Sequence, residues 1–202
     1  MPFTTVYWNA NGGSVSPTSS PNLTPDNPLT PPTPTRSGHA FCGWFTTSSG
    51  GTKIPAYVPH NDTTYYALWA GHPLTSASQF QDCGDICLLA RLVYGEASNN
   101  KQEQTGCAYV VKNRLQKGTW GNTYKSVILS PKQFTAMNGG QTLDPVLTSS
   151  KWTNSLDVAL NFTSYTNPIG TRMYFWPNDL YENEGASHKN PVIFGGTTFF
   201  DW

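Results

Sequence analysis

The composition of this chain excludes several classes of function. Among its 202 residues, 12 basic side chains balance 12 acidic ones, so it lacks the net positive charge that nucleic-acid and anionic-membrane binding proteins use. No stretch approaches the roughly 20 apolar residues of a membrane-spanning helix, and residues 1–8 do not have the pattern of a signal peptide. We therefore expect neither a nucleic-acid partner nor a membrane span.

The length and the residue types indicate two modest domains of an extracellular or cell-wall-associated protein. A chain of 202 residues exceeds the usual single-domain length of about 100–150. Only 12% of the residues are charged, against about 25% in an average globular protein, so solubility depends on Thr, Ser, Asn and Gly. We expect a monomer, although nothing in the sequence fixes the oligomeric state.

Residues 1–70 are predicted to form a small β module. Aromatic and β-branched residues alternate up to the turn at residues 11–13, and two further aromatic strands are expected at 40–45 and 64–69. Seven prolines between Pro17 and Pro34 exclude a helix there and favour an extended surface crossing. The three strands are expected to pack around Trp8, Trp44 and Trp69, because a small sheet must bury its large rings.

The order of these segments resembles the internalin-type B-repeat, a β-grasp-like module of bacterial surface proteins. The resemblance is carried by VYWNANGG at residues 6–13, PTRSGHAFCGWFT at residues 34–46, and residues 63–69. It implies a role in spacing or attachment.

Residues 71–78 form an expected linker, and residues 79–202 an expected second, mostly helical domain. Apolar residues recur at three- and four-residue spacing in four segments, which predicts four helices. Their ranges are 85–96, about 102–116 with Gly118 as terminator, 124–129 and 151–162, the last with Trp152, Leu156, Ala159 and Leu160 directed inward. Strand-like aromatic segments follow at 173–176 and 197–200. The predicted fold class is therefore α+β.

Metal and other cofactors are not expected. The cysteines are Cys42, Cys83, Cys87 and Cys107, and neither they nor the four histidines show an HxxxH or CxxC pairing. The even number of cysteines permits a disulfide, and their redox state stays open.

Glu96 is the candidate catalytic residue. Cleavage of a glycosidic bond needs a carboxylic acid that stays protonated near neutral pH, and burial among apolar groups raises the pKa of a glutamate. Glu96 ends the first predicted helix, directly after an apolar run, and its small neighbour Gly95 is expected to leave room for a substrate. The alternative is a solvated surface charge.

Three blocks of the second domain resemble the spore-cortex-lytic, or SleB-type, cell-wall hydrolase family. They are LLARLVYGEA at residues 88–97, VVKNR at 110–114 and VILSPKQFT at 127–135, within a resemblance that extends over about residues 84–200. The family implies a muramidase-like enzyme, commonly a lytic transglycosylase, on a lysozyme-related fold. Its catalytic glutamate corresponds to Glu96, and its substrate is peptidoglycan.

The resemblance also implies substrate-contacting residues, each with a structural alternative. Gln133 either hydrogen-bonds a sugar or fixes its own loop, and Tyr94 and Phe134 either form apolar walls of the cleft or pack in the core. Tyr174 is expected to line the groove, and His188, in a small-residue segment, either contacts substrate or is a surface histidine. Asn113 and Arg114 are expected to hold the adjoining loop.

The sequence also departs from the family pattern at two positions. Glu103 stands where the family commonly has glycine, and Thr197 where a histidine is expected. No second carboxylate is evident beside Glu96, although Asp144, Asp179, Glu182 and Glu184 lie in downstream loops. A single-acid mechanism that ends in a 1,6-anhydromuramoyl product is therefore the leading hypothesis.

Two alternatives to the enzymatic hypothesis remain. The second domain can be a degenerate hydrolase fold that only binds glycan, or a cysteine peptidase or amidase that uses Cys107 with His188. The second of these requires a thiolate beside its base.

Overall fold

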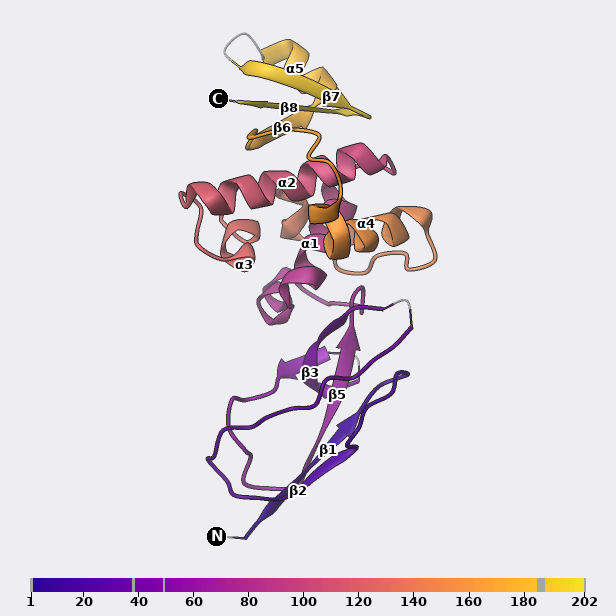
Figure 1. The fold of residues 1–202 in the computed structure, drawn as a ribbon, viewed down its shortest axis with the longest axis vertical. Helices are drawn as coiled ribbons and strands as arrows, with labels where there is room; N and C mark the ends of the chain where they lie inside the picture. The colour runs from indigo at the N-terminus through magenta and orange to yellow at the C-terminus, as the bar shows by residue number, and fades with distance from the viewer. Residues whose placement is uncertain (1, 38, 49, 185–187, 202) are drawn as a thin grey trace.

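The chain is arranged along its long axis as a β module, a layer of helices and a second small sheet (Figure 1). The computed structural model describes residues 2–37, 39–48, 50–184 and 188–201. Both helices and strands are present, so the predicted α+β class is confirmed, while the likeness to lysozyme stays a prediction.

The β module is a five-stranded mixed sheet. Its strands are β1 (Thr4–Asn9), β2 (Ser19–Leu23), β3 (Phe41–Thr47), β4 (Gly50–Lys53) and β5 (Thr63–Trp69). They lie in the order β2-β1-β5-β3-β4, and the central pair β1 and β5 is parallel. Trp8, Trp44 and Trp69 are buried in one cluster with Val6 and Tyr65, as the alternation of aromatic residues predicted.

The proline-rich segment is partly a strand, which corrects the prediction of an extended crossing. Residues 19–23 pair with β1 in antiparallel register at the edge of the sheet. Pro21 lies in this strand, and an edge position tolerates a proline because the missing N–H faces away from the ladder.

Four α-helices form the middle layer and confirm the four predicted helices to within a residue or two. They are α1 (Asp85–Glu96), α2 (Lys101–Lys117), α3 (Tyr124–Ile128) and α4 (Ser150–Asn161). The Asn100 side chain accepts hydrogen bonds from the amides of Gln102 and Glu103 at the start of α2, and Gly118 ends this helix with φ of +76°. Leu160 was predicted to point inward but is exposed, because it lies on the outer face of α4.

Four short 3-10 turns precede, connect and follow these helices. They are η1 (Ala77–Asp82), η2 (Thr135–Asn138), η3 (Gly140–Thr142) and η4 (Phe162–Ser164). The far end of the molecule holds β6 (Tyr174–Pro177), α5 (Asn178–Glu184), β7 (Lys189–Phe194) and β8 (Thr197–Asp201). The three strands form an antiparallel sheet in the order β6-β8-β7, and the aromatic residues of β8 pack toward α2 and β6.

The segment predicted as a linker is packed rather than loose. Gly71, His72 and Leu74 are buried, and Cys42 and Ala70 of the β module belong to the same apolar cluster as α1 and α2. The fully buried Arg91 of α1 donates from Nη2 to the carbonyl of His72. The β module is thus joined to the helices by side-chain contacts as well as by the chain.

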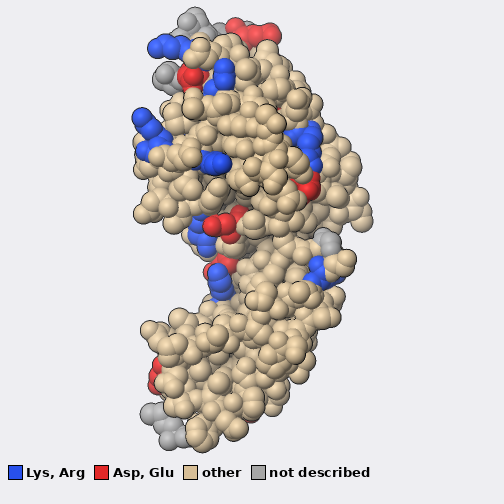
Figure 2. Space-filling view, in the orientation of Figure 1, with Lys and Arg blue, Asp and Glu red and all other residues tan. Residues whose placement is uncertain are grey.

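Charged side chains form no large single-sign patch on the face shown in Figure 2, in keeping with the balanced composition. Within the described ranges, no helix combines the length and apolar character that crossing a bilayer requires.

We expect Gly71→Ala to destabilise the junction more than a matched glycine substitution. Gly71 has φ of +86°, and a Cβ there would lie 2.3 Å from Leu147 Cδ2 and 2.7 Å from Trp152 Cζ2. Gly118 has a similar φ of +76° with nothing within 4 Å, so Gly118→Ala carries only the left-handed backbone cost. Overpacking should make Gly71→Ala less stable by a further ~1–3 kcal/mol in urea unfolding. Equal losses for the two variants would contradict the tight packing of this segment.

Candidate active site

A cavity of about 460 Å³ lies where the end of α1 meets the loop before η2, strand β6 and helix α5. It contains the Glu96 side chain and a wall of aromatic rings. The lining residues are Glu96, Arg114, Lys132, Gln133, Thr135, Tyr174, Phe175, Trp176, Pro177 and Leu180. Elements far apart in the sequence therefore enclose one acidic side chain.

Glu96 is the last residue of α1 and is half-buried. Its Oε1 accepts a hydrogen bond of 2.8 Å from the backbone amide of Ala136 in η2. A Cβ at Gly95 would lie 2.5 Å from both Ala136 Cβ and Thr142 Cγ2. Gly95 therefore lets this loop approach the helix end, rather than leaving room for a substrate as the sequence had suggested.

Burial raises the pKa of Glu96 above its ordinary value, which favours the protonated acid. The carboxyl also lies at the C-terminal end of a helix, whose partial negative charge disfavours a carboxylate. The Ala136 amide and the positive charge of Arg114 act in the opposite direction and limit the rise. The net shift is upward, as a proton donor near neutral pH requires.

Arg114 holds the wall of the cavity and supplies its buried positive charge. Its Nε donates to the carbonyl of Met173 at 2.7 Å and its Nη1 to Gln133 Oε1 at 3.3 Å. The guanidinium lies 4.7 Å from the ring centroid of Phe134 and 5.6 Å from that of Tyr174. Burial lowers the pKa of Arg114 to about 10, so it remains a cation at neutral pH.

Asn113 and Arg114 do hold a loop, but it is the segment of residues 170–173 before β6, whereas the prediction was the loop that adjoins α2. Asn113 Nδ2 donates to the carbonyls of Gly170 and Arg172, next to the Met173 carbonyl that Arg114 binds. For Arg114 the prediction was incomplete, because the sequence gave no sign that its side chain would also line the cavity with Glu96.

Two of the five predicted substrate contacts line the cavity and three do not. Gln133 and Tyr174 lie in its wall. Tyr94 is buried in the core, where its ring packs against Trp152 and its hydroxyl accepts from the Val146 amide, so we withdraw it as a substrate contact. Phe134 is also buried, and its ring packs against the Arg114 guanidinium. It therefore contacts a lining residue of the cavity but does not line the cavity itself.

His188 lies behind the cavity wall rather than in it. Its ring centroid is 4.6 Å from that of Trp176 and 4.3 Å from that of Phe200. The neighbouring residues 185–187, which carried the small-residue motif, lie outside the described residues. We therefore withdraw His188 as a direct substrate contact as well.

The peptidase hypothesis does not fit the structure. Cys107 is completely buried in α2, and burial raises the pKa of its thiol well above the ordinary value. A nucleophilic cysteine needs an accessible thiolate, which this environment disfavours.

Sequence reasoning missed most of the aromatic wall. Phe175, Trp176 and Pro177 of β6 line the cavity together with Leu180 of α5. The aromatic run at residues 173–176 was recognised as a strand. Which of its faces would meet Glu96 depends on how β6 pairs with β8, and the sequence does not specify this pairing.

Among the described residues that line the cavity, Glu96 carries the sole carboxyl group. Asp144, Asp179 and Glu182 are not part of this lining, and the side chain of Glu184 lies outside the described set. Glu103 is buried elsewhere, where its carboxylate accepts hydrogen bonds from the hydroxyls of Thr197 and Ser98. The two positions that depart from the family pattern are thus direct partners of each other.

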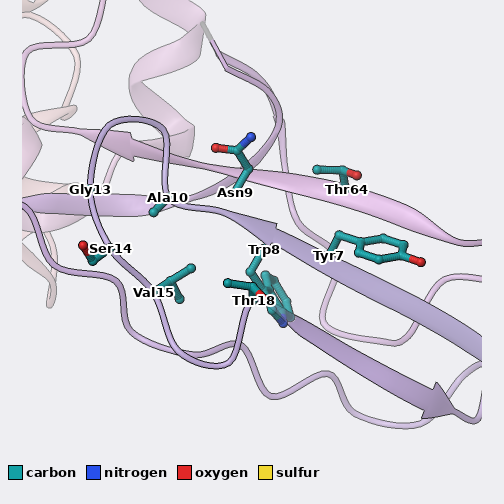
Figure 3. Close-up of a pocket in the computed structure, with 9 residues that line it drawn as sticks. All are labelled: Tyr7, Trp8, Asn9, Ala10, Gly13, Ser14, Val15, Thr18 and Thr64. Carbon is teal, nitrogen blue, oxygen red and sulfur yellow. The ribbon is translucent and has the colours of Figure 1, made fainter.

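A larger hollow of about 580 Å³ lies on the β module, beside β1 and the loop that follows it (Figure 3). Its lining includes Tyr7, Trp8, Asn9 and Val15, and no carboxylic acid is among the described residues that line it. Trp8 is buried and donates from Nε1 to Ser20 Oγ at 2.9 Å. This hollow offers no proton donor for glycoside chemistry, so we place the candidate active site at Glu96.

Glu96→Gln is expected to stabilise the protein at neutral pH. Because the pKa of Glu96 is raised in the folded state, the folded chain binds more protons than the unfolded chain between the two pKa values. Stability therefore falls as pH rises through that window, and a neutral glutamine avoids this loss. In urea unfolding at pH 7, the free energy of unfolding of Glu96→Gln should exceed that of the wild type. The difference should vanish near pH 4. Glu182→Gln, at an exposed position, should show no such pH-dependent gain. If Glu96→Gln remained more stable than the wild type at low pH, the raised pKa of Glu96 would not be the cause of its higher stability.

Both parts of the chain match described protein families. Residues 5–68 match the Listeria-Bacteroides repeat domain, and residues 98–200 match the Cell Wall Hydrolase family. The second match begins two residues after Glu96 and contains Arg114, Gln133 and Tyr174, so the family model itself does not cover Glu96.

Related proteins are spore cortex-lytic enzymes. The chain is 32% identical over 111 residues to that of Oceanobacillus iheyensis, covering 54% of this chain and 38% of the relative. It is 33% identical over 97 residues to that of Bacillus cereus, covering 47% and 35%. The chain therefore spans little more than a third of the length of these relatives.

Two solved structures are similar to part of this chain. The catalytic domain of the germination-specific lytic transglycosylase SleB from Bacillus anthracis is 22% identical, with a TM-score of 0.46 over 58% of this chain and 93% of that one. The catalytic domain of SleB from Bacillus cereus is 28% identical, with a TM-score of 0.46 over 58% and 89%. By the match over residues 98–200, just over half of its length, the chain belongs to the Cell Wall Hydrolase family.

Proposed function

We propose that this chain cleaves the glycan strands of peptidoglycan, with Glu96 as general acid and then general base. The observation that carries the proposal is the position of Glu96, a half-buried carboxyl with a raised pKa in a cavity walled by aromatic rings. Family membership and the names of the cortex-lytic relatives support peptidoglycan as the substrate. The β module is assigned to attachment or spacing, and the site of action to the outside of the cell or its wall.

The proposed reaction begins with proton transfer from Glu96 to the glycosidic oxygen. As that bond breaks, positive charge develops on the anomeric carbon, and Glu96 is left as a carboxylate. The C6 hydroxyl of the same sugar then attacks the anomeric carbon and returns its proton to Glu96. The products are a new sugar hydroxyl on one fragment and a 1,6-anhydro ring on the other, without consumption of water.

The absence of a second carboxyl among the described lining residues favours this single-acid sequence. An inverting or retaining hydrolase uses two carboxyl groups, about 5–9.5 Å apart, that flank the bond. In the sequence proposed here one group serves both steps, because the intramolecular hydroxyl replaces an activated water or an enzyme nucleophile.

Aromatic and amide groups of the wall are suited to hold the sugars. Tyr174 and Trp176 line the cavity, and sugar rings can stack on aromatic rings through their apolar C–H faces. Gln133 is oriented by Arg114, which donates to its Oε1. We expect Gln133 to bind the N-acetyl or scissile region of the glycan.

Glu96→Gln should abolish cleavage while retaining glycan binding. Loss of general acid catalysis lowers rates by about 100- to 10,000-fold. The measurement is release of soluble muropeptides from purified peptidoglycan, with pull-down on insoluble peptidoglycan as the binding assay. Glu182→Gln serves as the matched control and should behave as wild type.

Mass spectrometry of the released fragments identifies the reaction. Anhydro ends are expected, whereas reducing muramic ends would show hydrolysis in place of transglycosylation. If the wild type releases nothing and Glu96→Gln binds equally well, the domain is a glycan-binding module and the enzymatic proposal is wrong.

The value of kcat/KM should fall as pH rises through the pKa of Glu96, because the protonated acid is the active form. Arg114→Met removes a positive charge that lowers this pKa, so the alkaline limb should move to higher pH. Arg114→Lys keeps the charge and should leave the limb near its wild-type position. A titration of the Glu96 carboxyl by carbon NMR checks the same shift without substrate. An unchanged pKa in Arg114→Met would remove the proposed electrostatic role of Arg114.

A further inference from the structure

Three metal-ligating side chains meet at the junction between the β module and the helical layer, and a fourth cysteine lies next to one of them. Cys42 comes from β3, His72 follows β5, Cys83 follows η1, and Cys87 lies in the first turn of α1. The donor atoms of Cys42, His72 and Cys87 all lie within 4.8 Å of one another. The Cys83 thiol is adjacent to that of Cys87 but lies outside this group of three, so it would reach a shared ion by a small movement of its side chain.

The spacing and the donor types suit tetrahedral zinc. Ligands about 2.3 Å from a central Zn²⁺ are separated from one another by about 3.8 Å, which is compatible with the observed cluster. Three cysteines with one histidine form a donor set of structural zinc sites. The three cysteines are buried, and His72 is 9% exposed. The site is therefore closed, with no coordination position open to substrate or water, as in structural zinc sites.

His72 is oriented as a zinc ligand. Its Nδ1 lies 3.0 Å from the carbonyl oxygen of Trp69, where the ring N–H can donate, and this leaves Nε2 as the ligand atom.

Arg91 supplies a positive charge that would balance the net negative charge of a zinc–thiolate cluster. Its guanidinium is fully buried, and its Nε donates to Cys87 Sγ at 3.5 Å. Arg91 forms no ion pair with a carboxylate in the part of the chain that the structure describes. A buried cation is costly without a counter-charge, and three thiolates around Zn²⁺ give a net charge of −1 next to it.

We propose that Cys42, His72, Cys83 and Cys87 bind one structural Zn²⁺, which fastens the β module to the hydrolase domain. Binding releases the protons of the three thiols and joins ligands from both parts of the chain. The site is separate from the Glu96 cavity, so this proposal does not depend on the proposed enzymatic activity.

The test is the metal content of the full chain purified under reducing conditions without added chelator. Elemental analysis should find about one zinc per chain. Replacement of zinc by Co²⁺ should give the thiolate-to-cobalt charge-transfer and d–d absorption bands of a tetrahedral sulfur-rich site. Chelation by EDTA should lower the melting temperature, and added Zn²⁺ should restore it.

The fourth buried cysteine provides a matched control. Cys42→Ser and Cys87→Ser should lose stoichiometric zinc, whereas Cys107→Ala removes an equally buried thiol outside the cluster and should keep it. If the ligand variants fail to fold, the zinc content and the cobalt spectrum of the wild type still decide the matter.

Four outcomes would overturn the proposal. One is a chain that binds no zinc even after reconstitution with Zn²⁺ and reductant. Another is a mass lower by two hydrogens under non-reducing conditions, which would show a disulfide between cluster cysteines. The third is iron in place of zinc, and the fourth is zinc that is retained in Cys42→Ser.

Discussion

The proposed active site depends on how the loop of residues 134–143 is held against helix α1. Glu96 accepts from the Ala136 amide at one end of this loop, and Arg91 donates to the carbonyls of Thr142 and Leu143 at the other. Both side chains come from the same helix, and Gly95 between them permits the close approach. The loop in turn shields the Glu96 carboxyl from water, which is the main cause of its raised pKa.

Two buried arginines organise the domain in comparable ways. Arg91 joins α1 to the segment that follows the β module, and Arg114 joins α2 to the start of β6. Each donates to backbone carbonyls of segments that lie far away in the sequence. Arg114 also sets the electrostatic field around Glu96, while Arg91 lies next to the proposed zinc ligands. Substitution of Arg114 would therefore affect the charge environment of Glu96 as well as packing. Substitution of Arg91 would affect the proposed zinc ligands as well as packing.

Glu103 and Thr197, the two departures from the resembled family, contact each other. Thr197 Oγ1 donates to Glu103 Oε1, and Gly195 leaves the space that the other carboxylate oxygen needs. A change at one position of such a buried pair leaves an unsatisfied polar group unless the other changes too. The pair connects α2 to β8, so it supports the small sheet whose strand β6 forms the aromatic wall.

The sequence by itself determined the elements whose signals are local. Apolar periodicity and Gly118 located α1 and α2, and Glu96 was named by its position after an apolar run together with the resemblance to the SleB-type family. The tertiary structure decided what depends on contacts between distant segments. The pairing of β2, the place of Arg114 in the cavity and the meeting of Cys42, His72 and Cys87 all follow from packing across the chain. Such contacts leave no periodic trace in the sequence, because they join residues separated by tens of positions.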